Sequence, residues 1–304
     1  MSQTETKDAL RPAAATKVTP QTLLQSKRAF TPLTALTAYD YPTARLADEA
    51  GIDMLLVGDS LGTAVLGYDN TLRVTMDDML HHARAVRRGT KRALLVVDMP
   101  YGSYQVSIED AVRNGLRFFK ECGSEAVKLE GGIAYAPHVK ALTQAEMPVV
   151  GHIGLTPQSV HRMGGYRVQG LSEMDAMRLR DDALALEEAG AIAIVLEGIP
   201  RELAAEITAF LSIPTIGIGA GPDCDGQILV FHDLFSLSFT RKPKFVRSFG
   251  DGRLLMERGI RDFRDAVMAK TFPDDHESYH MPKAEIVAER DVASTKQREV
   301  SVCK

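Results

Sequence analysis

Cysteine is scarce in this sequence, and the few cysteines present are far apart. There are three among 304 residues, Cys122, Cys224 and Cys303. Their number and spacing exclude a disulfide framework and lack the pairing of zinc ligands, which favours a reducing, cytoplasmic compartment. Long apolar runs are also missing, since none approaches the roughly 20 residues needed to span a bilayer. We therefore expect no association with a membrane.

Positive charge is not in excess either. The formal net charge is -4, whereas a nucleic-acid surface needs a basic patch, so no nucleic-acid partner is expected. Residues 1–17 mix both charges without an apolar core and are expected to form a disordered leader. Residues 281–304 are charged and poor in aromatics, which predicts a flexible tail. What remains, residues 18–280, has the length of a single α/β barrel domain.

Short apolar runs rich in β-branched residues recur along this domain. Eight of them have strand character: Leu33–Asp40, Asp53–Ser60, Ala93–Pro100, Ala126–Gly132, Pro148–Thr156, Ile192–Pro200, Pro214–Gly221 and Ile228–Leu234. Helical patterns lie at Pro42–Ala50, Met76–Arg88, Ile108–Glu121, Pro137–Glu146, Asp175–Ala189, Glu202–Leu211 and Leu254–Lys270. Alternating strands and helices imply a parallel sheet covered by helices. Eight strands favour a closed (β/α)₈ TIM barrel, with an open doubly wound sheet as the alternative.

Two details refine this architecture. Thr19-Pro20 resembles an N-cap followed by proline at the first helical position, which predicts an N-terminal helix towards Lys27. No helical pattern is visible in Pro222–Gln227, so the link between the seventh and eighth strands is expected to be short.

A helix–turn–strand unit is repeated three times. Glu49-Ala50-Gly51, Glu121-Cys122-Gly123 and Glu188-Ala189-Gly190 each end a predicted helix with glycine at the C-cap. The strands that follow finish in an acid next to glycine, in Gly58-Asp59, Glu130-Gly131 and Glu197-Gly198. Each unit thus delivers a carboxylate to the C-terminal end of a strand.

Charged residues interrupt strands that should be continuously apolar in a barrel. They are Asp59, Asp98, Lys128, Glu130 and Glu197, and His152 interrupts a fifth apolar run. Each has a structural explanation alone: an N-cap for the aspartates, a buried ion pair for Lys128 and Glu130, a turn for Glu197 and a hydrogen-bonded core position for His152. Together they predict one polar cavity at the C-terminal mouth of the barrel, where barrel enzymes place their catalytic groups.

Such a mouth suits a hard cation. Oxygen ligands without cysteine select an ion such as Mg²⁺, which takes one or two carboxylates, waters and substrate oxygens. Asp59 and Asp98 are the best pair of ligands, and Glu130 can hold a metal-bound water. A 2-keto acid can chelate the metal, which stabilises an enolate. Glu197 is then a candidate base, and Lys128 a partner for the substrate carboxylate.

Two glycine-rich stretches fit neither a Walker nor a Rossmann motif. Pro214–Gly221 ends the seventh predicted strand and indicates close backbone packing or a turn that faces a ligand. Met163–Gly170 follows the fifth strand and has the character of a lid-like loop.

At these residues the chain resembles the ketopantoate hydroxymethyltransferase family. The shared stretches run in family order from about Thr19 to His280, and include Val57-Gly58-Asp59-Ser60-Leu61-Gly62, Asp98-Met99-Pro100, Val127-Lys128-Leu129-Glu130-Gly131-Gly132, Gly151-His152-Ile153-Gly154-Leu155-Thr156-Pro157-Gln158 and Ile216-Gly217-Ile218-Gly219-Ala220-Gly221.

The resemblance implies a barrel of the phosphoenolpyruvate/pyruvate type that binds Mg²⁺. It also implies transfer of a one-carbon unit from 5,10-methylenetetrahydrofolate to 2-oxoisovalerate, giving 2-dehydropantoate for pantothenate synthesis, by a large homo-oligomer that is decameric in several bacteria. The matching positions make Asp59 and Asp98 metal ligands, Glu130 a metal-associated carboxylate and Glu197 the general base. They also place Ser60 and Lys128 against the keto acid, and His152 near a substrate oxygen.

Two other functions remain open at this stage. A carbon–carbon lyase of the same barrel superfamily would share the metal site, but its Lys-Lys-Cys-Gly loop is not found in this sequence. A non-catalytic barrel that binds a ligand would have lost one of the metal acids, and all are present.

Overall fold

The computed structural model describes residues 16–239 and 242–281, so residues 282–304 of the expected tail and residues 1–15 of the expected leader lie outside the described residues. Lys17, at the end of that leader, pairs with Glu125 at 2.6 Å. Two compact units divide the chain, Met1–Gly250 and Asp251–Lys304. This boundary falls inside the segment 18–280 that was expected to form one domain.

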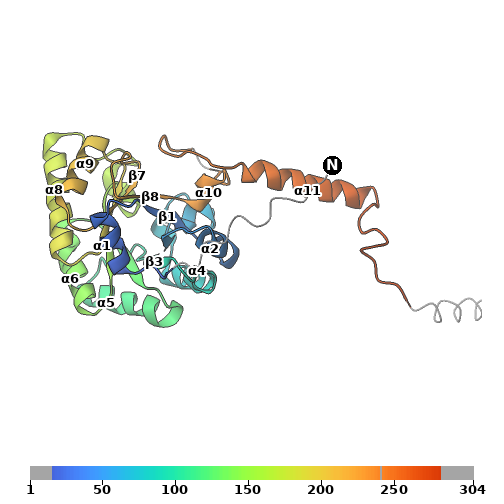
Figure 1. Cartoon of the computed structure of the whole chain (residues 1–304), viewed down its shortest axis with the longest axis horizontal. Helices are drawn as coiled ribbons and strands as arrows, with labels where there is room; N and C mark the ends of the chain where they lie inside the picture. Colours follow the sequence, from blue (N-terminus) through green and yellow to red (C-terminus); the bar gives the residue numbers. More distant parts are fainter. Residues whose placement is uncertain (1–15, 240–241, 282–304) are drawn as a thin grey trace, which may run out of the picture. The chain divides into compact units, whose positions relative to one another are not determined.

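Eight parallel strands form a closed barrel in chain order within the first unit (Figure 1). They are β1 (Leu33–Thr37), β2 (Met54–Val57), β3 (Leu94–Asp98), β4 (Ala126–Glu130), β5 (Val149–Gly154), β6 (Ala193–Glu197), β7 (Thr215–Ile218) and β8 (Gly226–Leu229). The barrel closes where β1 pairs with β8, with Leu33 opposite Gly226. The predicted (β/α)₈ barrel is therefore confirmed, and the open sheet is excluded.

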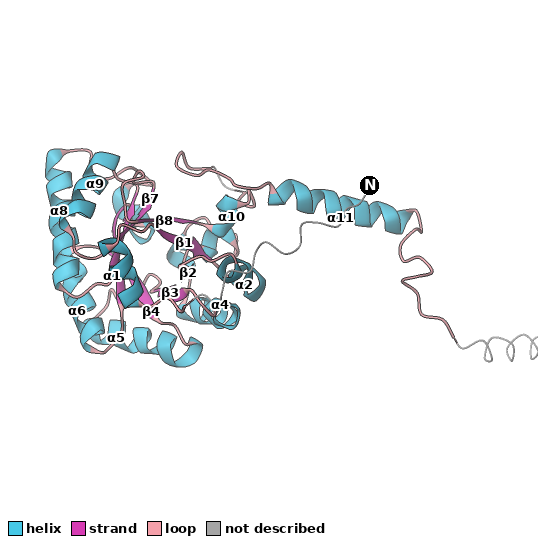
Figure 2. Ribbon diagram, in the orientation of Figure 1, coloured by secondary structure: helices cyan, strands magenta, loops and turns pink. Residues whose placement is uncertain are grey.

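Helices surround the strands, as Figure 2 shows. The longer helices of this unit are α1 (Pro20–Arg28), α2 (Tyr41–Glu49), α4 (Met76–Gly89), α5 (Ile108–Arg117), α6 (Ala136–Gln144), α8 (Glu173–Glu188) and α9 (Arg201–Phe210). Thr19 caps α1 as predicted. The last predicted helix, α11 (Gly252–Met268), belongs to the second unit.

Short helical segments were not predicted. They are α3 (Leu61–Ala64), α7 (Val160–Met163), α10 (Phe231–Leu234), the 3₁₀ turns η1 (Thr71–Arg73), η3 (Ile133–Tyr135) and η4 (Pro157–Ser159), and the π turn η2 (Phe118–Cys122) that extends α5. Most of them follow the C-terminal ends of strands, so they shape the mouth of the barrel.

The eighth predicted strand, Ile228–Leu234, was wrong over most of its length. The strand begins at Gly226 and ends at Leu229, and the residues from Phe231 form α10. The N–H of Phe231 donates to Thr37 Oγ1 at 2.9 Å, and its ring is buried. A short run that begins with four apolar residues fits a strand or a buried helical turn equally well, and pairing with β1 and β7 decides which part is strand. No helix lies between β7 and β8, as expected.

Alternation along the strands separates two apolar layers. One set of alternate strand residues fills the barrel interior: Leu33, Ala35, Met54, Leu56, Leu94, Val96, Ala126, Val150, Ala193, Val195, Ile216 and Ile228. The strand residues between them point outward and pack against the surrounding helices. Leu23 of α1 joins the interior cluster, so this helix closes the N-terminal end of the barrel. The opposite end is left for polar residues.

The repeated glycines end their helices as predicted. Gly51, Gly123 and Gly190 have φ values of 88°, 67° and 97°. This left-handed conformation is available to glycine at little cost, and it turns the chain from each helix into the next strand.

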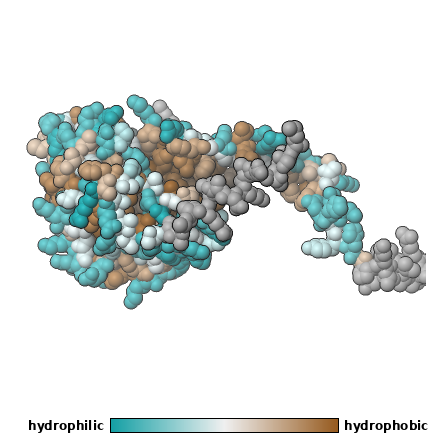
Figure 3. Space-filling model, in the orientation of Figure 1, coloured by the Kyte–Doolittle hydropathy of each residue, from teal (hydrophilic) through white to brown (hydrophobic). Residues whose placement is uncertain are grey.

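The surface of the barrel unit mixes hydrophilic and hydrophobic residues on the face drawn in Figure 3. Helix α11, in the second unit, exposes Leu255, Ile260, Phe263 and Met268. Among residues 16–239 and 242–281, no helix is both long and apolar enough to cross a membrane.

Candidate active site

Five of the predicted site residues lie at strand positions that face the barrel interior, at its C-terminal mouth. Asp98 continues the interior series of Leu94 and Val96, and Lys128 and Glu130 continue that of Ala126. His152 and Glu197 follow Val150 and Val195 in the same way. Every second residue of a strand faces inward, so the two-residue period of the strands directs these five side chains into the barrel interior.

Strand register then places them side by side. Asp98 is opposite Lys128, and Glu130 is opposite His152. Lys128 Nζ lies 2.6 Å from Asp98 Oδ1, with only 6% of either side chain exposed. Asp59, two residues beyond β2, donates its N–H to Asp98 Oδ2 at 3.1 Å. The structure thus brings five of the predicted residues together in one buried group, Asp59, Asp98, Lys128, Glu130 and His152.

The electrostatics of this group are dominated by excess negative charge. Burial, and then the neighbouring Asp98, raise the pKa of Asp59 from 3.8 to about 7. Burial, and then Asp59, raise the pKa of Glu130 well above its usual value. Burial opposes the charge of Lys128, but Asp98, Glu130 and Asp59 outweigh it and raise the pKa of the ammonium group. One lysine does not balance three carboxylates in so dry a place.

This donor set fits a divalent cation. The described residues contain no group of three or more His, Cys, Asp or Glu already arranged as a metal cage. Mg²⁺ takes one or two protein carboxylates and completes its shell with water and substrate oxygens. Asp59 and Asp98 supply hard oxygen atoms, and a dication would relieve the repulsion from Asp98 that adds to burial in raising the pKa of Asp59.

His152 connects the lysine to Glu197. Its Nδ1 lies 3.2 Å from Lys128 Nζ, and its Nε2 lies 3.2 Å from Glu197 Oε2. An ammonium group has hydrogens to donate and no acceptor, so Nδ1 is the acceptor and the ring hydrogen sits on Nε2, facing Glu197. Burial, and then Lys128, lower the pKa of His152, which keeps the ring neutral. His152 is therefore placed to orient the Glu197 carboxylate.

Glu197 and Ser60 lie closer to solvent than the rest of the group. The Glu197 side chain is 17% exposed, against 3% for His152. Ser60 precedes α3, and its hydroxyl lies 2.8 Å from the Tyr39 hydroxyl. Both can contact a small molecule that enters the mouth from outside.

Sequence reasoning missed three residues of this site, Gln158, Tyr104 and Tyr39. Gln158 Nε2 donates to Asp59 Oδ2 at 2.9 Å, and its main-chain N–H donates to Glu130 Oε2 at 3.0 Å. Tyr104, which is buried in the segment after β3, donates to Gln158 Oε1 at 2.8 Å. Neither residue ends a strand, so the signal that located the acids did not include them. Gln158 stands next to proline in a stretch shared with the family, but its contacts depend on the folded loop.

The two glycine-rich stretches also border the mouth. In the lid-like loop, the Gln169 N–H donates to Gly198 O at 2.9 Å, next to Glu197. Burial, followed by Asp59 and Glu197, raises the pKa of Tyr166 in that loop. At the end of β7, a Cβ on Gly219 would lie 2.6 Å from Phe245, so this stretch provides close packing.

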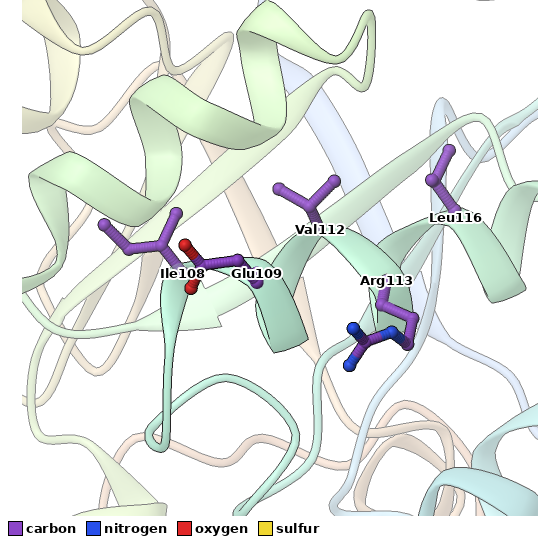
Figure 4. Close-up of a pocket in the computed structure, with 5 residues that line it drawn as sticks. All are labelled: Ile108, Glu109, Val112, Arg113 and Leu116. Carbon is purple, nitrogen blue, oxygen red and sulfur yellow. The ribbon is translucent and has the colours of Figure 1, made fainter.

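A separate surface groove lies on α5, away from the predicted site residues. Ile108, Glu109, Val112, Arg113 and Leu116 line it (Figure 4), and its volume is about 420 Å³. All five belong to one helix outside the barrel, and none has a counterpart in the charged group. The groove therefore plays no part in the chemistry at the mouth.

Known proteins are similar to this chain in sequence and in fold. The family described as ketopantoate hydroxymethyltransferase matches residues 17–275. The 3-methyl-2-oxobutanoate hydroxymethyltransferase of Koribacter versatilis (strain Ellin345) is 61% identical over 267 residues, which cover 88% of this chain and 90% of that protein.

More distant similarity is found among solved structures. Phosphonopyruvate hydrolase, solved in complex with oxalate and Mg²⁺, has a TM-score of 0.55 at 15% identity and covers 94% of this chain and 99% of its own. 2,3-Dimethylmalate lyase, described as a member of the PEP mutase/isocitrate lyase superfamily, has a TM-score of 0.51 at 18% identity, with 93% and 98% covered. At these identities the likeness concerns the fold alone, a closed barrel of eight parallel strands surrounded by helices.

Proposed function

The chain belongs to the ketopantoate hydroxymethyltransferase family, and on that premise we propose that it moves a one-carbon unit from 5,10-methylenetetrahydrofolate to 2-oxoisovalerate, giving 2-dehydropantoate. The resemblance found in the sequence motifs is thereby confirmed, and the protein is a hydroxymethyltransferase. The observation that carries the finer proposal is the buried carboxylate group at the mouth, joined through Lys128 and His152 to the more exposed Glu197.

We assign Mg²⁺ to Asp59 and Asp98, with Glu130 close enough to hold a metal-associated water. When bound, the ion would withdraw charge from the keto and carboxylate oxygens of the substrate and so acidify its α-hydrogen. The oxalate and Mg²⁺ in the phosphonopyruvate hydrolase structure support this choice, since oxalate has the same pair of adjacent oxygens as a 2-keto acid.

The remaining residues handle the substrate and its proton. Lys128 balances the substrate's negative charge, and Ser60 and His152 contact its oxygens. Glu197 faces the space from a strand different from those of the metal carboxylates, and its exposure leaves it accessible. It takes the α-hydrogen as a proton, and the electron pair left on the α-carbon forms the new bond to the methylene carbon of the folate. Both C–N bonds of that carbon break, water supplies the hydroxyl oxygen of the product, and tetrahydrofolate leaves with its nitrogens protonated.

We also propose a compartment, a side from which the folate approaches, and an oligomeric state. The two described cysteines, Cys122 and Cys224, are free thiols, which fits a cytoplasmic enzyme. The reduced folate is expected to approach the mouth from the side of the lid-like loop. A large homo-oligomer, decameric as in several bacteria of the family, would bury apolar residues that are exposed in the single chain, such as Ile260 and Phe263 of α11.

The alternatives are weaker. The lyase that shares the fold is 18% identical, whereas the named transferase is 61% identical. A non-catalytic barrel would have no need to retain the charged group, which costs folding free energy when no ligand is bound.

We expect the purified protein to convert 2-oxoisovalerate, in the presence of Mg²⁺ and 5,10-methylenetetrahydrofolate, into 2-dehydropantoate, detected by mass spectrometry. Exhaustive chelation should abolish the product, and added Mg²⁺ should restore it. Full turnover in protein shown by elemental analysis to be free of metal would refute the metal assignment. Product formed without the folate would refute the one-carbon donor.

Glu197 depends on a glycine in the neighbouring strand. Gly154 is opposite Glu197 and has φ of 94°, and a Cβ there would lie 2.3 Å from the Glu197 carbonyl oxygen. We expect Gly154→Ala to lower the free energy of unfolding by roughly 2 kcal/mol or more and to reduce turnover strongly, because the strand end must move. Urea unfolding and the product assay measure both effects.

Gly51 provides the matched control, since its φ is 88° but nothing lies within 4 Å of its added Cβ. Gly51→Ala should cost only the backbone strain, about 1–2 kcal/mol, and leave turnover per folded enzyme unchanged. Equal losses of turnover in the two variants would contradict the role given to Gly154.

A further inference from the structure

Gln158 contacts two acidic groups at the mouth, Asp59 and Glu130, neither of which is the ion-pair partner of Lys128. Its side-chain amide donates to Asp59 Oδ2, and its main-chain N–H donates to Glu130 Oε2. Asp59 follows β2 and Glu130 ends β4, whereas Gln158 lies in η4, which follows β5. One residue therefore ties three separate strand ends together at the mouth.

Every hydrogen-bonding position of the Gln158 side-chain amide is occupied. Its Nε2 donates to Asp59 Oδ2 and to Met99 O, each at 2.9 Å. Its Oε1 accepts from Tyr104 at 2.8 Å and from Gln105 at 3.2 Å. Two donors and two acceptor positions are all that a glutamine amide offers, so this arrangement sets both its position and its orientation.

Tyr104 holds the side-chain amide of Gln158 in place. It is 1% exposed, and its hydroxyl donates to Gln158 Oε1 and accepts from the Glu130 N–H at 3.2 Å. Its ring packs edge-on against Tyr135, with 5.2 Å between centroids. The hydroxyl is therefore bonded to Gln158 and to the backbone of Glu130 at once.

We propose that Gln158, held by Tyr104, is a positioning residue that orients the Asp59 and Glu130 carboxylates for the metal. An ionised carboxylate has two oxygens with about four acceptor positions, so these hydrogen bonds orient it without exhausting it as a ligand. Groups that orient metal ligands in this way typically account for 10–100-fold in metal affinity. The inference rests on the proposed function for the identity of the metal site.

The test uses Mn²⁺ as the metal and needs no substrate. Binding is followed by calorimetry and by electron paramagnetic resonance of the bound ion, on the full-length protein. Gln158→Met keeps the length of the side chain and removes the amide, so we expect Mn²⁺ affinity to fall about 10–100-fold. Tyr104→Phe removes only the hydroxyl and should weaken binding several-fold, because Gln105 and Met99 still hold the amide.

The double variant separates positioning from a general loss of structure. If Tyr104 acts through Gln158, the affinity of Gln158→Met/Tyr104→Phe should equal that of Gln158→Met within about twofold, whereas independent effects would multiply. Tyr135→Phe is the matched control: it removes a neighbouring tyrosine hydroxyl that takes no part in this network, and its affinity should stay unchanged.

Two results would overturn the proposal. Wild-type affinity in Gln158→Met would show that the amide does not position the carboxylates. Equal affinities in Tyr104→Phe and Tyr135→Phe would show that Tyr104 has no part in positioning them. The second comparison can be made even if Gln158→Met fails to fold. A wild-type protein that binds no Mn²⁺ would instead refute the metal assignment itself. Since no substrate is used, neither result depends on the transfer reaction.

Discussion

Glu197→Gln is expected to lose turnover by 10²–10⁴-fold, the contribution of a positioned general base. Glutamine keeps the size of the side chain and can still contact His152 Nε2, which lies 3.2 Å from the carboxylate. It cannot accept the proton from the α-carbon. The variant should also lose the Mg²⁺-dependent exchange of the α-hydrogen of 2-oxoisovalerate in D₂O, which NMR follows without any folate. Binding of Mg²⁺ and the keto acid should survive.

Glu187→Gln is a suitable control for this experiment. Glu187 accepts hydrogen bonds from the Ser212 and Ile213 N–H groups on the outside of the barrel. Its substitution changes a structural carboxylate and should leave exchange per folded enzyme at the wild-type rate. If Glu197→Gln also exchanges at that rate, another residue is the base, and the role proposed for Glu197 is wrong.

Asp59→Asn is expected to abolish metal-dependent activity and at the same time to stabilise the metal-free protein. The folded-state pKa of Asp59 is about 7, above its usual 3.8. Ionisation of this group therefore costs folding free energy that grows as the pH rises from about 4 and is complete above about 7. Removing the charge should raise the free energy of unfolding at pH 8 by about 1–3 kcal/mol. The gain should shrink as the pH is lowered towards 5.

Asp48→Asn provides the opposite case at another buried aspartate. Asp48 accepts hydrogen bonds from the N–H groups of Lys91, Arg92 and Ala93. An amide cannot replace all of these acceptors, so this variant should lose about 2 kcal/mol or more. Urea unfolding in the presence of a chelator, repeated with Mg²⁺, measures both variants. A destabilised Asp59→Asn protein would show that this carboxylate supports the fold, as Asp48 does.

The sequence by itself was sufficient for the fold class and the family, and it drew attention to the acids that the structure gathers at the barrel mouth. Eight apolar runs separated by helical patterns predicted the barrel because alternation and length survive in a linear chain. Asp98, Lys128, Glu130 and Glu197 were visible because a charge is conspicuous in an apolar strand, and a two-residue period determines the face on which it lies. The family motifs supplied the chemistry for the same positions.

Only the tertiary structure decided which groups touch. Strand register placed Asp98 beside Lys128, and pairing with β1 and β7 moved the eighth strand to Gly226–Leu229. The bonds from Gln158 and Tyr104 join residues up to 99 positions apart in the chain. Glutamine and tyrosine occur anywhere in a sequence, and their role appears when a folded loop leaves them buried with every polar atom paired. That pairing arises from three-dimensional packing, which no local pattern records.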